Sequence, residues 1–554
     1  ILKFYLVNYL KVKYILRVYY FMSRSILYFL ALTNSLLLAM ITPVNAHAFA
    51  QRYDLPVPLW LYLLGAGATV VLSFLIIIVI LGRDKEDDTP RLELLRTPLG
   101  RIFSHRYTLF CIKAFSVFFF LTVIIGGLFG TQTPPDNNIL PTTVWIIWWV
   151  GLAFFSALLG DLWDLINPWR IIAEWTSNLS CRFRSASIQK KKSLSRFSSV
   201  WPAVIVFVGF SWAELVWPDR AIPFSLAIAV IIYSAITWIG MYFRGIEVWL
   251  SRGEAFTILY GLFAKFSRIE CRVTNNNYCK TCYHSACRHN NKNYCTDCSW
   301  CFRKAVTTER RIDLRPYGVG LLTNHVPSIS MMVFILLVLA TVSFDGFADT
   351  PAWQNIFDTM VLTTFSRELT YLFDLNNSIG LITTLGIIVT PFIFFIVYIT
   401  FCAFVYLLTK NFSPVNMYGL PKKLSALHIA RIFIYTLIPI AIAYHLAHFL
   451  TLFLIYGQQI IPLISDPFGY GWDLFGTASY EVDIAFVGAK FAWISSVTAI
   501  VVGHVVAVFL SHTMAMRVFD NRSAVLRSQY PMLVLMVGYT MISLWILSQP
   551  IVES

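Results

Sequence analysis

Seven of the ten cysteines of this chain fall in one short segment, CRVTNNNYCKTCYHSACRHNNKNYCTDCSWC. Two cysteines separated by two residues can hold one metal ion from a tight turn. Two pairs have this spacing, namely Cys279 with Cys282 and Cys295 with Cys298. The sequence therefore predicts a tetrahedral zinc site with these four thiolates as ligands. The triplet that ends at Cys301 has ferredoxin-like spacing, so an iron–sulfur cluster is one alternative, although the Cys-Pro that completes that pattern is missing. A thiol-rich loop without metal is the other.

Three histidines lie in apolar stretches of the C-terminal half. His445 and His448 occur in YHLAHFL, and His504 occurs in GHVVAVF. Residues three apart share one face of a helix, and we expect His504 at a similar depth on the next helix. The interpretation is that the three imidazoles converge on a divalent metal ion of unknown identity or on a haem. Hydrogen bonding between helices and a proton relay are the alternatives.

The segment between these two stretches, IIPLISDPFGYGWDLFGTASYEVD, is rich in Gly, Pro and aromatic residues. This composition indicates a structured cap over the histidines. Asp466 and Asp473 would then be the catalytic carboxylates, acting as a base or as ligands of a second ion. Because Asp466 precedes Pro467, its alternative role is to start a turn.

The N-terminal region reads as a targeting segment. Residues 22–46 (MSRSILYFLALTNSLLLAMITPVNA) are typical of a secretory signal, and residues 1–21 are a possible upstream extension or a basic anchor. Cleavage after Ala46 would make His47 the mature N-terminus, where an amine and an imidazole could chelate a copper-type ion. Alternatively, His47 only follows the cut, or cleavage after Ala48 removes it.

The composition identifies the class of protein that carries these groups. Of the 554 residues, 57% are hydrophobic and 13% are charged, with a mean hydropathy of +0.67. A soluble globular chain carries about a quarter charged residues, so soluble enzymes and disordered tails are excluded. The net charge of +14 is attributed to positive residues on the cytoplasmic side of a membrane, and no nucleic-acid partner is expected.

Hydropathy predicts an all-α fold, a polytopic protein with about ten transmembrane helices after a signal peptide. The apolar windows are 57–82, 109–130, 141–159, 199–217, 223–243, 328–344, 379–408, 431–457, 488–511 and 531–549. Two further stretches, 162–176 and 247–266, mix aromatic and charged residues and are expected to lie in the membrane interface.

Three regions follow from these windows. They are a first transmembrane half (47–268), a Cys-rich metal-binding loop (269–312) and a second transmembrane half (313–554). Lys and Arg are concentrated in alternate loops and acidic residues in the others. This pattern favours a bacterial inner membrane protein with the Cys-rich loop in the cytoplasm and both mature termini outside.

Five segments carry a resemblance to a known family. They are AHAFAQRYDLPVPLWLYLLGAGATVVLSF (46–74), GDLWDLINPWR (160–170), RGEAFTILYGLFAKFSR (252–268), SFDGFADTPAW (343–353) and YHLAHFLTLFLIYGQQIIPLISDPFGYGWDLFGTA (444–478). They resemble, in the same order, the bacterial integral-membrane proteins called fenitrothion hydrolase. The resemblance implies cleavage of the P–O aryl bond of an organophosphorus triester. It supplies no catalytic residues, and the Cys-rich segment lies outside its pattern.

The functional hypothesis is therefore a metal-dependent hydrolase whose apolar substrate enters from the lipid bilayer. Metal bound at the three histidines would activate water and polarise the phosphoryl oxygen. The alternatives are a copper- or zinc-handling membrane protein and an electron-transfer subunit that holds haem between its last helices.

Overall fold

The computed structural model describes most of the chain. The described residues are 53–80, 91–95, 97–98, 100, 102, 105–183, 199–282, 287, 293–323, 325–362, 378–412, 414, 424–549 and 552–553. The predicted upstream extension, the signal peptide and His47 lie outside these ranges.

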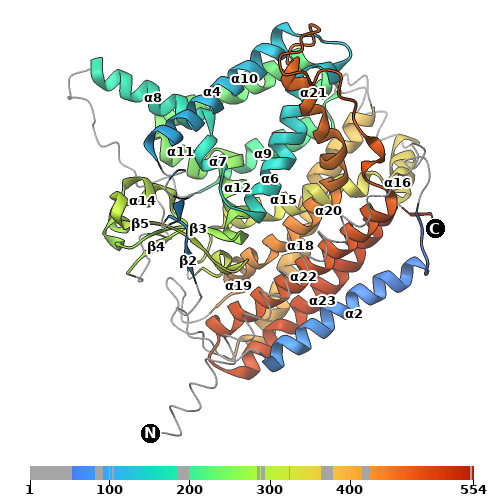
Figure 1. Cartoon of the computed structure of the whole chain (residues 1–554). Coiled ribbons are helices and arrows are strands. Elements are labelled where there is room, and N and C mark those ends of the chain that lie inside the picture. The colour runs from blue at the N-terminus through green and yellow to red at the C-terminus, as the bar shows by residue number, and fades with distance from the viewer. Residues whose placement is uncertain are drawn as a thin grey trace.

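The described part is an all-α polytopic membrane protein, as predicted, and nine of its helical segments are long and apolar enough to cross a bilayer. They are α2 (Leu59–Ile80), α4 (Arg106–Phe129), the run α5–η3–α6 (Ile139–Leu158), α10 (Pro223–Arg244), α15 (Ile329–Ala348), α18 (Ser378–Thr409), the run α19–η8–α20–η9–α21 (Ala426–Ser465), α22 (Ala489–Val518) and α23 (Arg522–Ser548). Figure 1 shows α2, α22 and α23 running side by side.

The predicted span 199–217 is shorter than expected. It forms α9 (Trp201–Leu215), whose 15 residues rise about 22 Å, less than the roughly 30 Å of a hydrocarbon core. Pro202 stands in its first turn, and Pro218 begins a separate 3-10 turn (η4, Pro218–Ala221) beyond its end.

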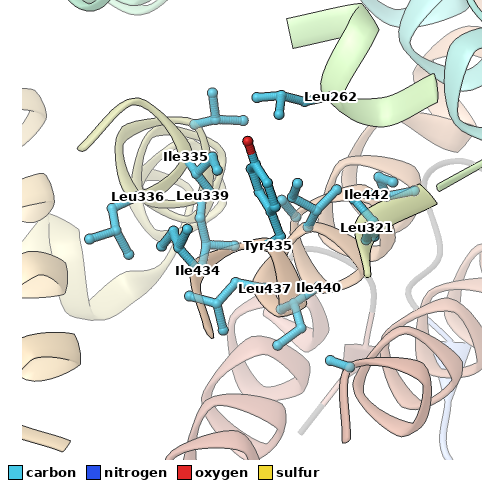
Figure 2. Packing of buried hydrophobic residues seen from close by; sticks show 14 of the residues in the cluster. Leu262, Leu321, Ile335, Leu336, Leu339, Ile434, Tyr435, Leu437, Ile440 and Ile442 are labelled. Atoms are coloured by element: carbon cyan, nitrogen blue, oxygen red, sulfur yellow. The ribbon is translucent and has the colours of Figure 1, made fainter. Parts of the chain in front are cut away.

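The centre of the helical body is α15 with the segments η8 (Ile434–Leu437) and α20 (Ile438–Tyr456). Figure 2 shows Tyr435 of η8 among aliphatic side chains of these elements. The helices α20 and α22 approach closely, because a Cβ at Gly503 would lie 2.3 Å from that of Ala443. Only glycine allows this spacing.

A short helix inside the body corrects one expectation. The stretch 247–266, expected in the interface, divides at Gly253 into α11 (Ile246–Arg252) and α12 (Ala255–Phe266). Side chains of α12 are buried, with Phe256 and Tyr260 both at 0% exposure. Glu254 caps this helix. Its carboxylate accepts hydrogen bonds from the backbone N–H groups of Phe256 and Thr257 at 2.9 and 2.7 Å.

A small sheet stands beside the helical body. Its strands pair antiparallel in the order β2 (Leu92–Glu93), β5 (Arg310–Leu314), β3 (Ile269–Val273) and β4 (Cys295–Thr296). Figure 1 shows this sheet with α14 (Ser299–Lys304) at one flank of the helices. A separate parallel pair joins β1 (Tyr53–Asp54) to β6 (Val552–Glu553).

Candidate metal centre

The cysteines of the predicted zinc site are carried by short elements of the small sheet region. Cys279 lies in the 3-10 turn η5 (Asn276–Thr281), and Cys282 follows it. Cys295 begins β4, and Cys298 is the N-cap residue of α14. These elements are short, and each CxxC pair lies on a tight turn, as a pair that binds one metal ion requires.

The turn between β4 and α14 shows how the second pair is shaped. Asp297 adopts φ = 51°, the left-handed conformation that a short Asp side chain tolerates. Its backbone N–H donates to the carbonyl of Cys271 on β3 at 2.9 Å. Its carboxylate pairs with Arg315 at 2.6 Å. The turn that separates Cys295 from Cys298 is therefore fixed from two directions.

Six buried thiols meet in this region. Cys287 and Cys301 join the four predicted residues, and none of the six is more than 7% exposed. The Sγ atoms of Cys282 and Cys298 are 3.6 Å apart, and that of Cys287 is 3.4 Å from those of Cys295 and Cys301. A thiol cluster of this compactness could hold a metal ion.

The thiols form two overlapping sets of four, in each of which all Sγ atoms lie within 4.8 Å of one another. One set is Cys279, Cys287, Cys295 and Cys301; the other is Cys282, Cys287, Cys298 and Cys301. The four predicted cysteines thus all belong to the cluster, but they are divided between two sets. The CxxCxxC triplet gave a signal for Cys301, whereas Cys287 has no partner at motif spacing.

The thiols of this region differ in acidity. Hydrogen bonds with neighbouring thiols, Cys282 first, lower the pKa of Cys298 and of Cys301, whereas they raise the pKa of Cys287. Cys271 belongs to neither set, and burial followed by the charge of Asp297 raises the pKa of its thiol.

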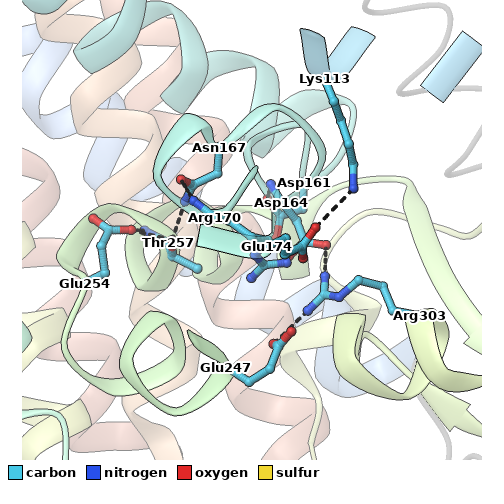
Figure 3. Close-up of polar contacts among 10 residues, drawn as sticks. All are labelled: Lys113, Asp161, Asp164, Asn167, Arg170, Glu174, Glu247, Glu254, Thr257 and Arg303. Carbon is cyan, nitrogen blue, oxygen red and sulfur yellow. Dashed lines mark hydrogen bonds and ion pairs between the residues drawn. The ribbon is translucent and has the colours of Figure 1, made fainter. Parts of the chain in front are cut away.

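Arg303 of α14 attaches the cluster region to the helical body. It donates to Asp164 at 2.7 Å and to Glu247 of α11 at 2.8 Å. Figure 3 shows Asp164 between two arginines, Arg303 and Arg170. Because Arg303 is two residues from Cys301, the position of that thiol is linked to both carboxylates.

A second arginine makes a more deeply buried connection. The guanidinium of Arg315, 1% exposed, pairs with Glu270 of β3 at 3.0 Å as well as with Asp297. It also donates to the backbone carbonyls of Lys265 and Ser267 at the end of α12, at 3.1 and 3.3 Å. The sheet is therefore held directly to a buried helix.

The three predicted intramembrane histidines point to different surroundings. His445 packs among aromatic rings, with Trp149, Phe154 and Phe449 at centroid distances of 5.1, 5.6 and 4.7 Å. Its Nε2 is buried and has no hydrogen-bond partner among the described residues.

His448 instead faces α15, where its Nε2 lies 2.8 Å from Oδ2 of Asp345. His504 on α22 faces α23, with its ring 5.7 Å from that of Tyr539 and its Nδ1 2.8 Å from the carbonyl of Ile500. Within the described ranges, groups of three or more His, Cys, Asp or Glu ligands at metal-binding distances consist of cysteines alone. The three imidazoles are thus not brought to one point.

The predicted catalytic carboxylates accept backbone hydrogen bonds within their own loop. Asp466 accepts from the N–H groups of Tyr470 and Gly471 at 3.0 and 2.6 Å, which is the turn role named as its alternative. Asp473 accepts from Ala478 at 3.0 Å.

Comparison of the chain with protein-family models, with curated proteins and with solved structures finds no match.

Proposed function

We propose that this membrane protein binds zinc through its buried thiols. The observation that carries the proposal is the spacing of the sulfur atoms. A tetrahedral zinc with Zn–S bonds of about 2.3 Å places its thiolates about 3.8 Å apart, since the tetrahedral edge is about 1.63 times the bond. The measured separations of 3.4 and 3.6 Å are close to this edge. In an iron–sulfur cluster, thiolates bound to different iron atoms are held farther apart because iron and sulfide lie between them, whereas here four Sγ atoms all lie within 4.8 Å of one another.

The proposed role of zinc is to hold the sheet region against the membrane helices. Besides its cysteines, the buried core that the described residues of this region form has only Val273, Trp300 and Ala305, with Tyr278 and Phe302 packed against it. So small an apolar core gains its stability from metal binding in many small domains. Zinc on Cys301 would also fix α14, and with it the contacts of Arg303 to Asp164 and Glu247.

The test is the metal content of the full-length protein purified in detergent, followed by chelation. We expect zinc in the purified protein. On its removal we expect faster amide hydrogen exchange in β3, β4 and α14, with α20 and α22 unchanged. Protein free of zinc, or exchange unaffected by chelation, would contradict the proposal. Iron with acid-labile sulfide would do so as well.

We further propose the bacterial inner membrane, with the thiol cluster in the cytoplasm and both ends of the mature chain outside. This orientation counts α9 as a crossing in addition to the nine longer segments, and the pairing of β1 with β6 supports placing both ends on one side. Loops expected on one side contact each other: β2 pairs with β5, and Pro414 forms a bridge with Phe519. Loops expected on the opposite side also meet, as in the hydrogen bond from Thr131 to the carbonyl of Phe468 at 2.7 Å. Alkaline phosphatase fused after residue 549 should be active, and a fusion after residue 304 inactive. The reverse pattern would overturn this orientation.

A second candidate function is hydrolysis of an apolar ester such as an organophosphorus triester. The favouring observation is the pair of His448 and Asp345, since a carboxylate that orients an imidazole is the arrangement of a general base. In proteoliposomes with fenitrothion, we expect His448→Ala and Asp345→Asn to lower nitrophenol release by about 10²–10⁴-fold. His105→Ala is the control and should retain it. Absence of release in the wild type, or full activity in both variants, would refute this function.

A further inference from the structure

We propose that the thiol cluster is a two-metal centre, in which Cys287 and Cys301 each bridge two zinc ions. This inference rests on the proposed zinc binding and extends it to the number of ions and their connection. Its basis is that the two sets of four thiols share these two residues and no others.

The sharing defines a ligand for every position of a two-metal centre. Each ion has two bridging thiolates and two terminal ones. The terminal pair of one ion is Cys279 with Cys295, and that of the other is Cys282 with Cys298. Each CxxC motif therefore contributes its first cysteine to one ion and its second cysteine to the other. This differs from the usual arrangement, in which one CxxC motif holds a single ion.

A single ion would use four of the six buried thiols and leave two that do not bind it. If one ion took the set that contains Cys279, then Cys282 and Cys298 would remain as buried thiols 3.6 Å apart beside it. If it took the other set, Cys279 and Cys295 would be left, and these are also only 3% and 2% exposed. Neither set is distinguished by burial, because every member of both is buried. Two ions use all six thiols.

The bridging positions agree with the measured distances. Cys287 and Cys301 have their Sγ atoms 3.4 Å apart. Two tetrahedra that share an edge share two ligands, and the length of this edge is about 3.8 Å for zinc thiolates. The shared pair is thus spaced as the common edge of two tetrahedra. Thiolate sulfur has the lone pairs to bind two ions at once.

Zinc per chain, measured by mass spectrometry on the full-length protein in detergent, is the first test. Two zinc ions support the two-metal centre. One zinc ion overturns it but leaves the proposed zinc binding intact, whereas no zinc overturns both. The two failures are therefore distinguishable.

Cysteine variants test which thiols are shared. Cys279→Ser removes a terminal ligand of one ion and should reduce the content to about one zinc per chain. Cys287→Ser removes a ligand of both ions and should reduce it below one. Cys271→Ser, in the same region but in neither set, and Cys111→Ser, on α4, are matched controls that should retain two. Equal contents in Cys279→Ser and Cys287→Ser would overturn the bridge.

Cobalt substitution tests the bridge without relying on a variant that folds. An isolated high-spin cobalt(II) ion gives a strong paramagnetic resonance signal, and two cobalt ions joined by thiolates couple and lose it. During cobalt loading of the metal-free wild type, the signal should rise up to about one ion per chain and fall as the second is added. A signal that doubles at two ions per chain would overturn the shared thiolates.

Discussion

Replacement of Arg315 by Met tests whether the buried arginine holds the sheet region to α12. The change leaves Glu270, itself 1% exposed, without its buried partner at 3.0 Å. Removing one partner of a buried ion pair costs about 3–5 kcal/mol. Arg91, 2.5 Å from Glu270, remains as a counter-charge, so we use the lower end of about 3 kcal/mol. At about 1.4 kcal/mol per tenfold, this equals a roughly 100-fold change in a local opening equilibrium.

The assay is amide hydrogen exchange of β3 in the full-length protein, where each factor of ten in opening appears as a factor of ten in exchange rate. Arg311→Met, on the strand β5 that Arg315 directly follows, is the matched control. Arg311 pairs with Glu93 at 3.0 Å, but the two side chains are 26% and 18% exposed. Such pairs contribute about 1 kcal/mol or less, so exchange should rise by less than about fivefold. Equal effects of the two substitutions, or less than a fivefold effect of Arg315→Met, would refute the reasoning.

Two further predictions concern helix packing and pH. Gly503→Ala should destabilise the protein by about 1–3 kcal/mol, because its Cβ would lie 2.3 Å from that of Ala443. The control Gly538→Ala, whose Cβ would have no atom within 4 Å, should be neutral or stabilising. Thermal denaturation in detergent compares the two variants, and equal melting temperatures would contradict the close approach of α20 and α22. Hydrogen bonds from Asn275 and then Tyr278 lower the pKa of Glu309, so its stabilisation of the sheet region should be present above about pH 4.5 and be lost as pH falls through the lowered pKa. Hydrogen exchange of the sheet region in wild type and Glu309→Ala should therefore differ at neutral pH and converge under acid conditions, and a difference that grows on acidification would exclude this role.

The membrane fold was predictable because long apolar windows are a strong signal. Only α9 fell short, since prolines limit it at both ends. The interfacial assignment of 247–266 failed for α12 because aromatic residues that suit a membrane surface equally suit a packed interior, and neighbouring helices cover them here. The small sheet was not foreseen, because β2 and β5 are far apart in the chain and β2 has only two residues.

The site was predictable in part because the spacing of its cysteines is also a strong sequence signal. Spacing along the chain identified both CxxC motifs, but the division of each motif between two sets depends on where Cys287 and Cys301 lie in space. The histidines show the limit more clearly. His445 and His448 are about 60° apart around α20, and packing on two sides of that helix directs one ring to Trp149 and the other to Asp345.

The helix α12 has a mechanical consequence for the thiol cluster. It ends at Phe266, and β3 begins at Ile269, whose N–H donates to the carbonyl of Leu159 at 3.1 Å. The connection between α12 and the strand β3 of the thiol region is therefore short and hydrogen-bonded, not a flexible linker. A tilt of the sheet would therefore require α12, which is packed inside the helical body, to tilt with it. Strain produced by gain or loss of an ion would consequently reach Phe256 and Tyr260, which are fully buried.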